Sequence, residues 1–396
     1  MDGDMAMSLF DKFGLSDGPQ MTVPDYNLHL PDMRSDWQQL VVIGNGFDSA
    51  CQLKSDFVSF FTPRLEKLQS IERIGISNGK SVGSQLREAG LTVWDIILSD
   101  RSGDNWCDIE AAIAKWIRPC KPPHFIDLLD SIFALEFNDR AWQRSLLPQE
   151  STENHVRNYL IEGKFGLEDG YSRDKFNKLL LDELHRLEEA FDTYLTKQVE
   201  ETPRYPEDAR QLLHDLIKRG VPSEEDYRIE RSVLSFNYTG PKEMGCDFDG
   251  IPYVNIHGRL GEGIIFGVDG KGMMTNANVA PFTKTYRLMA KGGPQHYEVL
   301  PGEVDLIKFF GHSLAAADYS YFQAMFDAVN LYDGDTCLVF YYRPYAGKSE
   351  LEVRTDMMNR VTGLLSTYGE TLDNVDHGNN LIHRLLLEGR LSVELI

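Results

Sequence analysis

Residues 40–57 read LVVIGNGFDSACQLKSDF, an apolar run that meets the glycine turn Gly44-Asn45-Gly46 and then an acid at Asp48. The run LVVIG is continuous and rich in β-branched residues, which is typical of a strand buried on both faces of a parallel sheet. After Asp48 the apolar residues recur at the spacing of an amphipathic helix. The stretch therefore predicts a strand, a tight turn and a helix, the first βα unit of an α/β fold.

Two roles stay open for each part of this turn. Glycines after a strand let a ligand approach the backbone, and the following helix points free N–H groups at it, so Gly44, Asn45 and Gly46 suit a phosphate cradle. They suit a plain tight turn equally well. Asp48 either caps the helix or binds the ribose hydroxyls of a nucleotide, because an ionised carboxylate at this position repels a pyrophosphate.

The composition favours a globular protein and disfavours several partners. The chain has 396 residues, of which 42% are hydrophobic, enough for two domains or one large domain with an insertion. Its formal net charge of −21 repels nucleic-acid phosphates and anionic lipid, so we expect neither long nucleic acid nor membrane as a partner. The five scattered cysteines and the absence of a signal-peptide pattern predict a cytoplasmic protein.

The chain divides into three predicted parts. Residues 1–37 show no sustained periodicity and are interpreted as an N-terminal arm. Residues 63–230 contain amphipathic stretches such as FNKLLLDELHRLEEAFDTYL and are interpreted as a large helical insertion after the first βα unit. Residues 38–62 and 231–396 form the predicted α/β domain. The arm and the insertion are where we expect a contact with a second copy of the chain.

Strand-like segments return late in the chain and alternate with a helical pattern over residues 318–330. This alternation predicts a Rossmann-like parallel sheet flanked by helices. The predicted strands after the first lie within residues 232–240, 252–258, 263–270, 304–314 and 335–344.

Polar residues and glycines follow these strands directly. Because ligands of open α/β sheets bind outside the carboxyl ends of the strands, we expect these residues to meet the first glycine turn at one edge of the sheet. They are Asn237, Thr239, His257, Gly258, Gly311, His312 and Ser313.

Six segments in this order resemble the AbiH family of bacterial phage-abortive-infection proteins. They are IGNGFD, NWCDIEAAI, LSFNYTGPKE, VNIHGRL, IIFGVD and FFGHSLAAADYSYF, and together they span residues 40 to about 342. The resemblance implies a role in defence, in which infected cells die or stall before the phage spreads. It also makes the arm and the insertion the expected contact sites of a phage-derived trigger. It does not imply a particular reaction.

The same motifs resemble, more distantly, sirtuins and sirtuin-like enzymes that cleave NAD. This resemblance implies a sirtuin- or deoxyhypusine-synthase-like fold and NAD as substrate or ligand. It implies catalytic roles for His257 and Asn237, and nucleotide binding by the residues matched to the family's glycine turns. Thr239 stands where the family has an aspartate, and the zinc-binding cysteines of the deacetylases are absent. The nucleotide-binding residues would be Gly44, Asn45, Gly46, Asp48, Thr239, Gly258, Gly311 and Ser313.

Three functions remain open from the sequence. The first is hydrolysis of NAD to nicotinamide and ADP-ribose, with His257 as the general base and Asn237 orienting the ribose or the water, and with no metal. The second is a module that senses NAD or ADP-ribose without cutting it. The third is a nuclease or phosphohydrolase in which Asp48, Asp269 and Asp318 hold Mg²⁺, since hard cations take carboxylate oxygens.

Overall fold

The computed structural model describes residues 35–74, 80, 82–99, 109–117, 152, 155–156, 159, 173–246, 250–292, 299–345 and 347–396. Most of the predicted N-terminal arm therefore lies outside the described residues. The first residues of the NWCDIEAAI segment, Asp108 among them, also lie outside them.

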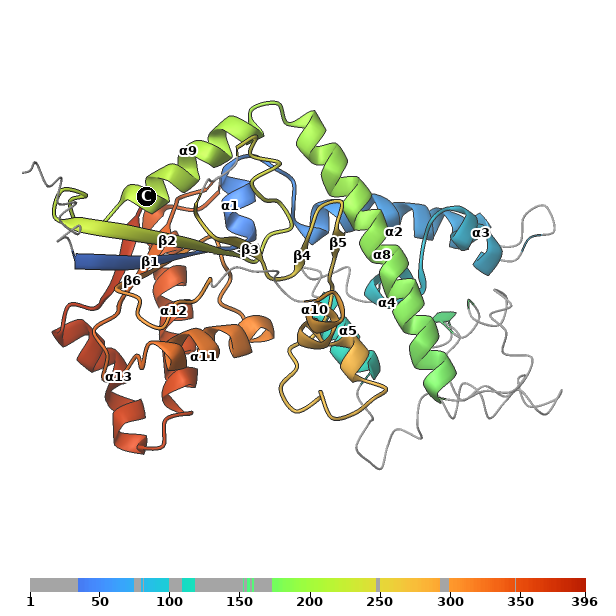
Figure 1. Ribbon diagram of the computed structural model, residues 1–396. Coiled ribbons are helices and arrows are strands. Elements are labelled where there is room, and N and C mark those ends of the chain that lie inside the picture. Colours follow the sequence, from blue (N-terminus) through green and yellow to red (C-terminus); the bar gives the residue numbers. More distant parts are fainter. Residues whose placement is uncertain are drawn as a thin grey trace, which may run out of the picture.

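Six parallel strands form one sheet in the order β3-β2-β1-β6-β7-β8. Helices cover both faces of this sheet (Figure 1), so the prediction of an α/β fold with a helix-flanked parallel sheet is confirmed. The strands are β1 (Ser35–Ile43), β2 (Tyr227–Ser235), β3 (Tyr253–Asn255), β6 (Leu306–Phe310), β7 (Cys337–Tyr342) and β8 (Leu391–Leu395).

The continuous apolar run of β1 is explained by two separate cores. Val41 and Ile43 belong to a core shared with helix α9 (Tyr205–Lys218), whereas Leu40 and Val42 belong to a core on the opposite face. Successive strand residues point to opposite faces, so a central strand between two helical layers needs an apolar residue at every position. The opposite core is completed by α11 (Tyr319–Ala328), α12 (Glu350–Gly369) and α13 (Val375–Leu387).

The described residues between β1 and β2 are largely helical. Figure 1 shows α9 above the sheet, with most of the other helices of this segment gathered to one side of it. None of the described helices reaches the length and apolarity of a membrane-spanning helix. The helices are α1 (Asn45–Ala50), α2 (Phe57–Ile74), α3 (Val82–Glu88), α4 (Val93–Ser99), α5 (Ile109–Ile117), α8 (Arg173–Glu201) and α9.

Three features differ from the sequence-based expectations. Residues 263–270 do not add a strand to the sheet: β5 (Gly263–Ile264) pairs in antiparallel fashion with β4 (Gly258–Arg259) in a separate ribbon. Strand β8 was not predicted, because its sequence LSVEL is short and follows two helices. Strand β2 begins at Tyr227, before residues 232–240, where this strand was predicted.

Candidate functional site

The glycine turn after β1 packs against the turn after β6. The Gly44 N–H donates to the Phe310 carbonyl (3.0 Å), and the Gly46 N–H donates to the Gly311 carbonyl (2.7 Å). A Cβ added at Gly44 would lie 2.7 Å from Cα of His312, and one at Gly46 would lie 2.7 Å from Cα of Gly311. These glycines therefore allow two backbone turns to touch. The amides of Gly44 and Gly46, two of the three expected in a phosphate cradle, already have protein acceptors.

The other predicted binding residues lie in different surroundings. Asn45 is exposed, and its Oδ1 accepts a hydrogen bond from Ser55 Oγ (2.5 Å). Ser313 is exposed. Gly258 has φ +84°, and a Cβ there would lie 2.3 Å from the Gly263 carbonyl oxygen, so this glycine permits the close β4–β5 pairing.

Asp48 is buried and bonded to two hydroxyl groups. Tyr205 Oη donates to Oδ1 (2.7 Å), and Thr239 Oγ1 lies 2.9 Å from the same oxygen. Burial raises the pKa of Asp48 to about 7, against the lowering effect of these two hydrogen bonds. Asp48 thus ties α1 to the start of α9 and, through Thr239, to the loop after β2.

Replacing Asp48 by asparagine should flatten the pH dependence of stability. The folded-state pKa lies above the ordinary carboxyl value, so this proton stabilises the fold at acidic pH and the stabilisation is lost as pH rises through 7. Between pH 5 and pH 8 we expect wild type to lose about 2 kcal/mol more than Asp48→Asn in urea unfolding. The exposed Asp36→Asn is the control. Parallel pH profiles of wild type and Asp48→Asn would contradict this assignment.

A buried cluster at the ends of β3 and β6 centres on Asp318. Its Oδ1 accepts a hydrogen bond from Lys284 Nζ (2.6 Å). The same oxygen lies 3.0 Å from His257 Nε2, but this second contact does not have the geometry of a hydrogen bond. Its Oδ2 lies 3.3 Å from His312 Nε2. Lys284 also forms an ion pair with Glu110 of α5. The cluster thus joins two strand ends to α10 (Lys284–Ala290) and to the segment between β1 and β2.

The charges of the cluster favour an ionised carboxylate beside a neutral imidazole. Burial alone would raise the pKa of Asp318, but the neighbouring His257 and Lys284 hold it well below its ordinary value. Burial, followed by the Lys284 charge, lowers the pKa of His257 to about 4. Burial opposes the charge of Lys284, yet Asp318 and Glu110 outweigh it and raise the lysine pKa. At neutral pH, His257 is therefore a neutral imidazole that can accept a proton.

The tautomer of His312 follows from its two contacts. Its Nδ1 accepts a hydrogen bond from the Leu314 N–H (2.8 Å), so the ring proton sits on Nε2 and faces Asp318. Leu314 has φ +56°, a left-handed conformation that is uncommon for leucine and that this short turn requires.

Asn237, at the end of β2, is 3% exposed, and neither its Oδ1 nor its Nδ2 has a hydrogen-bond partner among the described residues. Its backbone is held in place, because Asn255 Nδ2 donates to the carbonyls of Asn237 (2.8 Å) and Thr239 (2.7 Å). Buried amide groups almost always have partners. An immobilised amide with none is a candidate for binding a ligand.

The ring of Phe236 packs against both histidines of the cluster. The Phe236 ring lies 4.4 Å from the His312 ring and 5.3 Å from the His257 ring, measured between centroids. His312 itself packs directly on Gly44. Phe236 and His312 therefore occupy the space between the first glycine turn and His257.

The three carboxylates of the metal-dependent alternative have separate partners. Asp48 binds Tyr205 and Thr239, as described above, and Asp269 Oδ1 accepts from Ser320 Oγ (2.6 Å). Asp318 is surrounded by Lys284 and the two histidines. Among the described residues, no group of three or more His, Cys, Asp or Glu side chains is placed to hold a metal ion.

Sequence reasoning did not assign Asp318 and Lys284 to the histidine cluster. Asp318 immediately precedes α11, where an acid is expected to cap the helix, and its side chain makes no such bond. Lys284 stands in a segment without strand or glycine-turn signals. The one available signal was the place of Asp318 shortly after the Gly-His-Ser turn.

Comparison with known proteins gives one match. The family model described as bacteriophage abortive infection AbiH matches residues 40–341, more than half of the chain. No curated protein matches the chain, and no solved structure does. The matched residues run from the apolar part of β1 to near the end of β7, and they include every residue of the Asp318 cluster. The chain belongs to the AbiH family of bacteriophage abortive infection.

Proposed function

We propose that this chain acts in phage defence by hydrolysing NAD to nicotinamide and ADP-ribose at the carboxyl ends of β2 and β3, once infection has triggered it. The observation that carries the proposal is the pairing of an unpartnered buried amide, Asn237, with a neutral buried imidazole, His257, at neighbouring strand ends. The distant likeness of the motifs to sirtuin-like enzymes supports the choice of substrate.

Asp318 supplies the carboxylate that position 239 lacks. Facing Nε2 of His257, it favours the tautomer with the proton on that nitrogen and leaves the lone pair of Nδ1 free to accept a proton. The described residues make no hydrogen bond to this Nδ1. Asp318 is therefore a positioning residue, and His257 is the general base.

In the proposed reaction the bond between C1′ of the ribose and the nicotinamide nitrogen breaks. Nicotinamide leaves as a neutral molecule with the bonding electron pair, so it needs no acid catalyst. A water oxygen forms the new bond to C1′, and its proton passes to Nδ1 of His257. The amide of Asn237 can accept from a ribose hydroxyl or from this water and donate to the other.

A dinucleotide lying across the strand ends must displace the rings of Phe236 and His312. This requirement suits an enzyme that stays inactive until infection, because a permanently open NADase would exhaust its own host. The second candidate, a module that senses the nucleotide, is favoured by the same filled space. Product formation separates the two.

The proposal is tested in cells that express the full chain and are infected with phage. We expect NAD to fall and nicotinamide to rise during infection, whether or not the lysate is assayed with EDTA. Asn237→Ala should slow nicotinamide release by about 10–100-fold, the effect of losing hydrogen bonds made in the transition state. The exposed Asn276→Ala should behave as wild type.

Each alternative result has a definite meaning. Unchanged NAD during an infection that the chain still resists would overturn the hydrolase. Saturable NAD binding by purified protein without nicotinamide release would then favour the sensing module. Nucleic-acid hydrolysis abolished by EDTA would favour the metal-dependent alternative.

A further inference from the structure

Strand β2 has a partner along its whole length on one side only. On that side β1 is in register with it from Tyr227 to Ser235. On the other side β3 pairs only with Val233–Ser235. Among the described residues, the stretch from Tyr227 to Ser232 therefore has an edge without a neighbouring strand.

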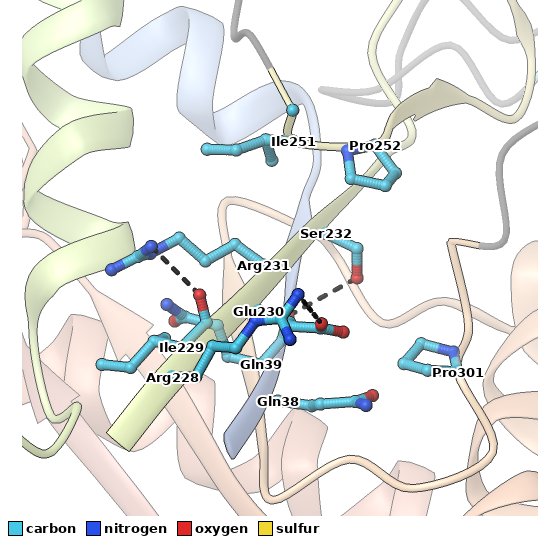
Figure 2. Close-up of a pocket in the computed structure, with 11 residues that line it drawn as sticks. Gln38, Gln39, Arg228, Ile229, Glu230, Arg231, Ser232, Ile251, Pro252 and Pro301 are labelled. Atoms are coloured by element: carbon cyan, nitrogen blue, oxygen red, sulfur yellow. Dashed lines mark hydrogen bonds and ion pairs between the residues drawn. The ribbon is translucent and has the colours of Figure 1, made fainter. Parts of the chain in front are cut away.

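A cavity of about 620 Å³ lies beside this free edge. Side chains of β2 that point to opposite faces of the sheet both line it: Arg228 and Glu230 on one face, Ile229 and Arg231 on the other. Because both sets line it, the cavity reaches the edge of β2 along which a further strand would run, and it also extends to Gln38 and Gln39 of β1. Figure 2 shows Ile251 and Pro252 next to β2 and Pro301 farther from it, on the side toward which Gln38 points.

Two polar atoms of the cavity lining are buried without a partner among the described residues. They are Nε of Arg231, on β2 itself, and Oε1 of Gln38, which belongs to β1 on the other side of β2 from the free edge. The rest of the Arg231 guanidinium is engaged, since one nitrogen donates to the Ile229 carbonyl (3.2 Å) and another pairs with Glu224. Unsatisfied buried polar atoms are rare in folded proteins and point to a missing partner.

We propose that this cavity binds an extended peptide segment of a partner protein, which adds to β2 as a strand. The Val233 N–H donates to the Pro252 carbonyl (2.8 Å), which fixes the side toward which alternate backbone groups of β2 point. Arg231 and Ile229 share that phase, so their N–H groups face the cavity. A peptide backbone supplies carbonyls for these N–H groups and an acceptor for Nε of Arg231.

A peptide fits this place better than a compact small molecule does. Five consecutive residues of one strand line the cavity, and the lining combines polar side chains with isoleucine and proline. It lies at the amino ends of β1 and β2, at the opposite end of these strands from the Asp318 cluster. Peptide binding here is therefore independent of the proposed hydrolysis.

The test selects peptides from a random library displayed on yeast, using the full chain, and measures affinities of the synthetic peptides by fluorescence polarisation. Ile229→Pro removes one edge N–H, and proline is tolerated at a strand edge. Ile229→Val keeps the N–H and is the matched control. We expect the proline variant to bind about tenfold more weakly than the valine variant, as for the loss of a backbone hydrogen bond.

A second measurement leaves the protein unchanged, in case Ile229→Pro fails to fold. Each selected peptide is N-methylated at successive positions. Strand addition predicts that methylation weakens binding at every second residue and is tolerated at the residues between. Equal sensitivity at all positions, equal affinity of the proline and valine variants, or a library that yields no peptide binding at this edge would overturn the proposal.

Discussion

Replacing His257 by alanine is expected to lower nicotinamide release by ~10²–10⁴-fold, the usual contribution of a positioned general base. The reason is that the His257 imidazole is neutral at neutral pH, with Nε2 beside Asp318 and with no hydrogen bond to Nδ1 from the described residues. The control is His377→Ala. His377 is another histidine followed by glycine, but it lies in α13 and stacks on Tyr332. Single-turnover release by purified, triggered protein is the measurement.

The pH profile distinguishes catalysis from mere folding support. Activity of wild type should fall as pH drops through about 4, where His257 gains a proton. Asp318→Asn removes a charge that raises the His257 pKa, so this limb should move to lower pH while the rate falls by about 100-fold. A His257→Ala variant that folds and keeps the wild-type rate would exclude the imidazole as the base.

Gly311→Ala is expected to cost about 2–4 kcal/mol of unfolding free energy or to prevent folding altogether. Gly311 has φ +72°, which strains any residue with a Cβ. The added Cβ would also lie 2.3 Å from the Phe47 amide nitrogen and 3.0 Å from the Gly44 carbonyl oxygen. Backbone atoms cannot move aside as a flexible side chain does, so the two turns would have to separate.

Gly363→Ala in α12 is the matched control for that experiment. Apart from the chain neighbours and the nearby backbone of α12 itself, no described atom lies within 4 Å of a Cβ placed there. Alanine is also the better helix former, so stability should stay unchanged or rise by about 0.5–1 kcal/mol. Urea unfolding followed by circular dichroism measures both variants. Equal midpoints for Gly311→Ala and wild type would show that the turns after β1 and β6 are not in contact.

The sheet was predictable because its central strands need apolar residues on both faces. The continuous apolar run LVVIG predicts such a strand, and the later strands also contain short apolar runs. The sequence could not show that GIIFGVDG leaves the sheet, because a short apolar run looks the same in a ribbon and in a sheet. The sequence also could not show that a lysine is fully buried inside the sheet. Lys308 lies in β6, where its Nζ donates to the Leu216 carbonyl (2.8 Å) at the end of α9.

The candidate site was predictable where strand ends were recognisable. His257, Asn237 and the turn after β6 follow apolar runs, and parallel strands carry such residues to a common edge. The role of Gly44 and Gly46 was not predictable, since glycines that admit a ligand and glycines that admit another backbone look alike in sequence. Asp318, Lys284 and Glu110 meet through tertiary packing, for which a single sequence has no periodic signal.

The Asp318 cluster also bears on the protein's synthesis. Its members come from position 110 onward to position 318, and β6, which lies beside β1 in the sheet, is made after about three quarters of the chain. A ribosome that releases the nascent chain before codon 318 leaves a product without the carboxylate that orients His257. Under the proposed mechanism, incomplete translation products would therefore lack NAD hydrolysis.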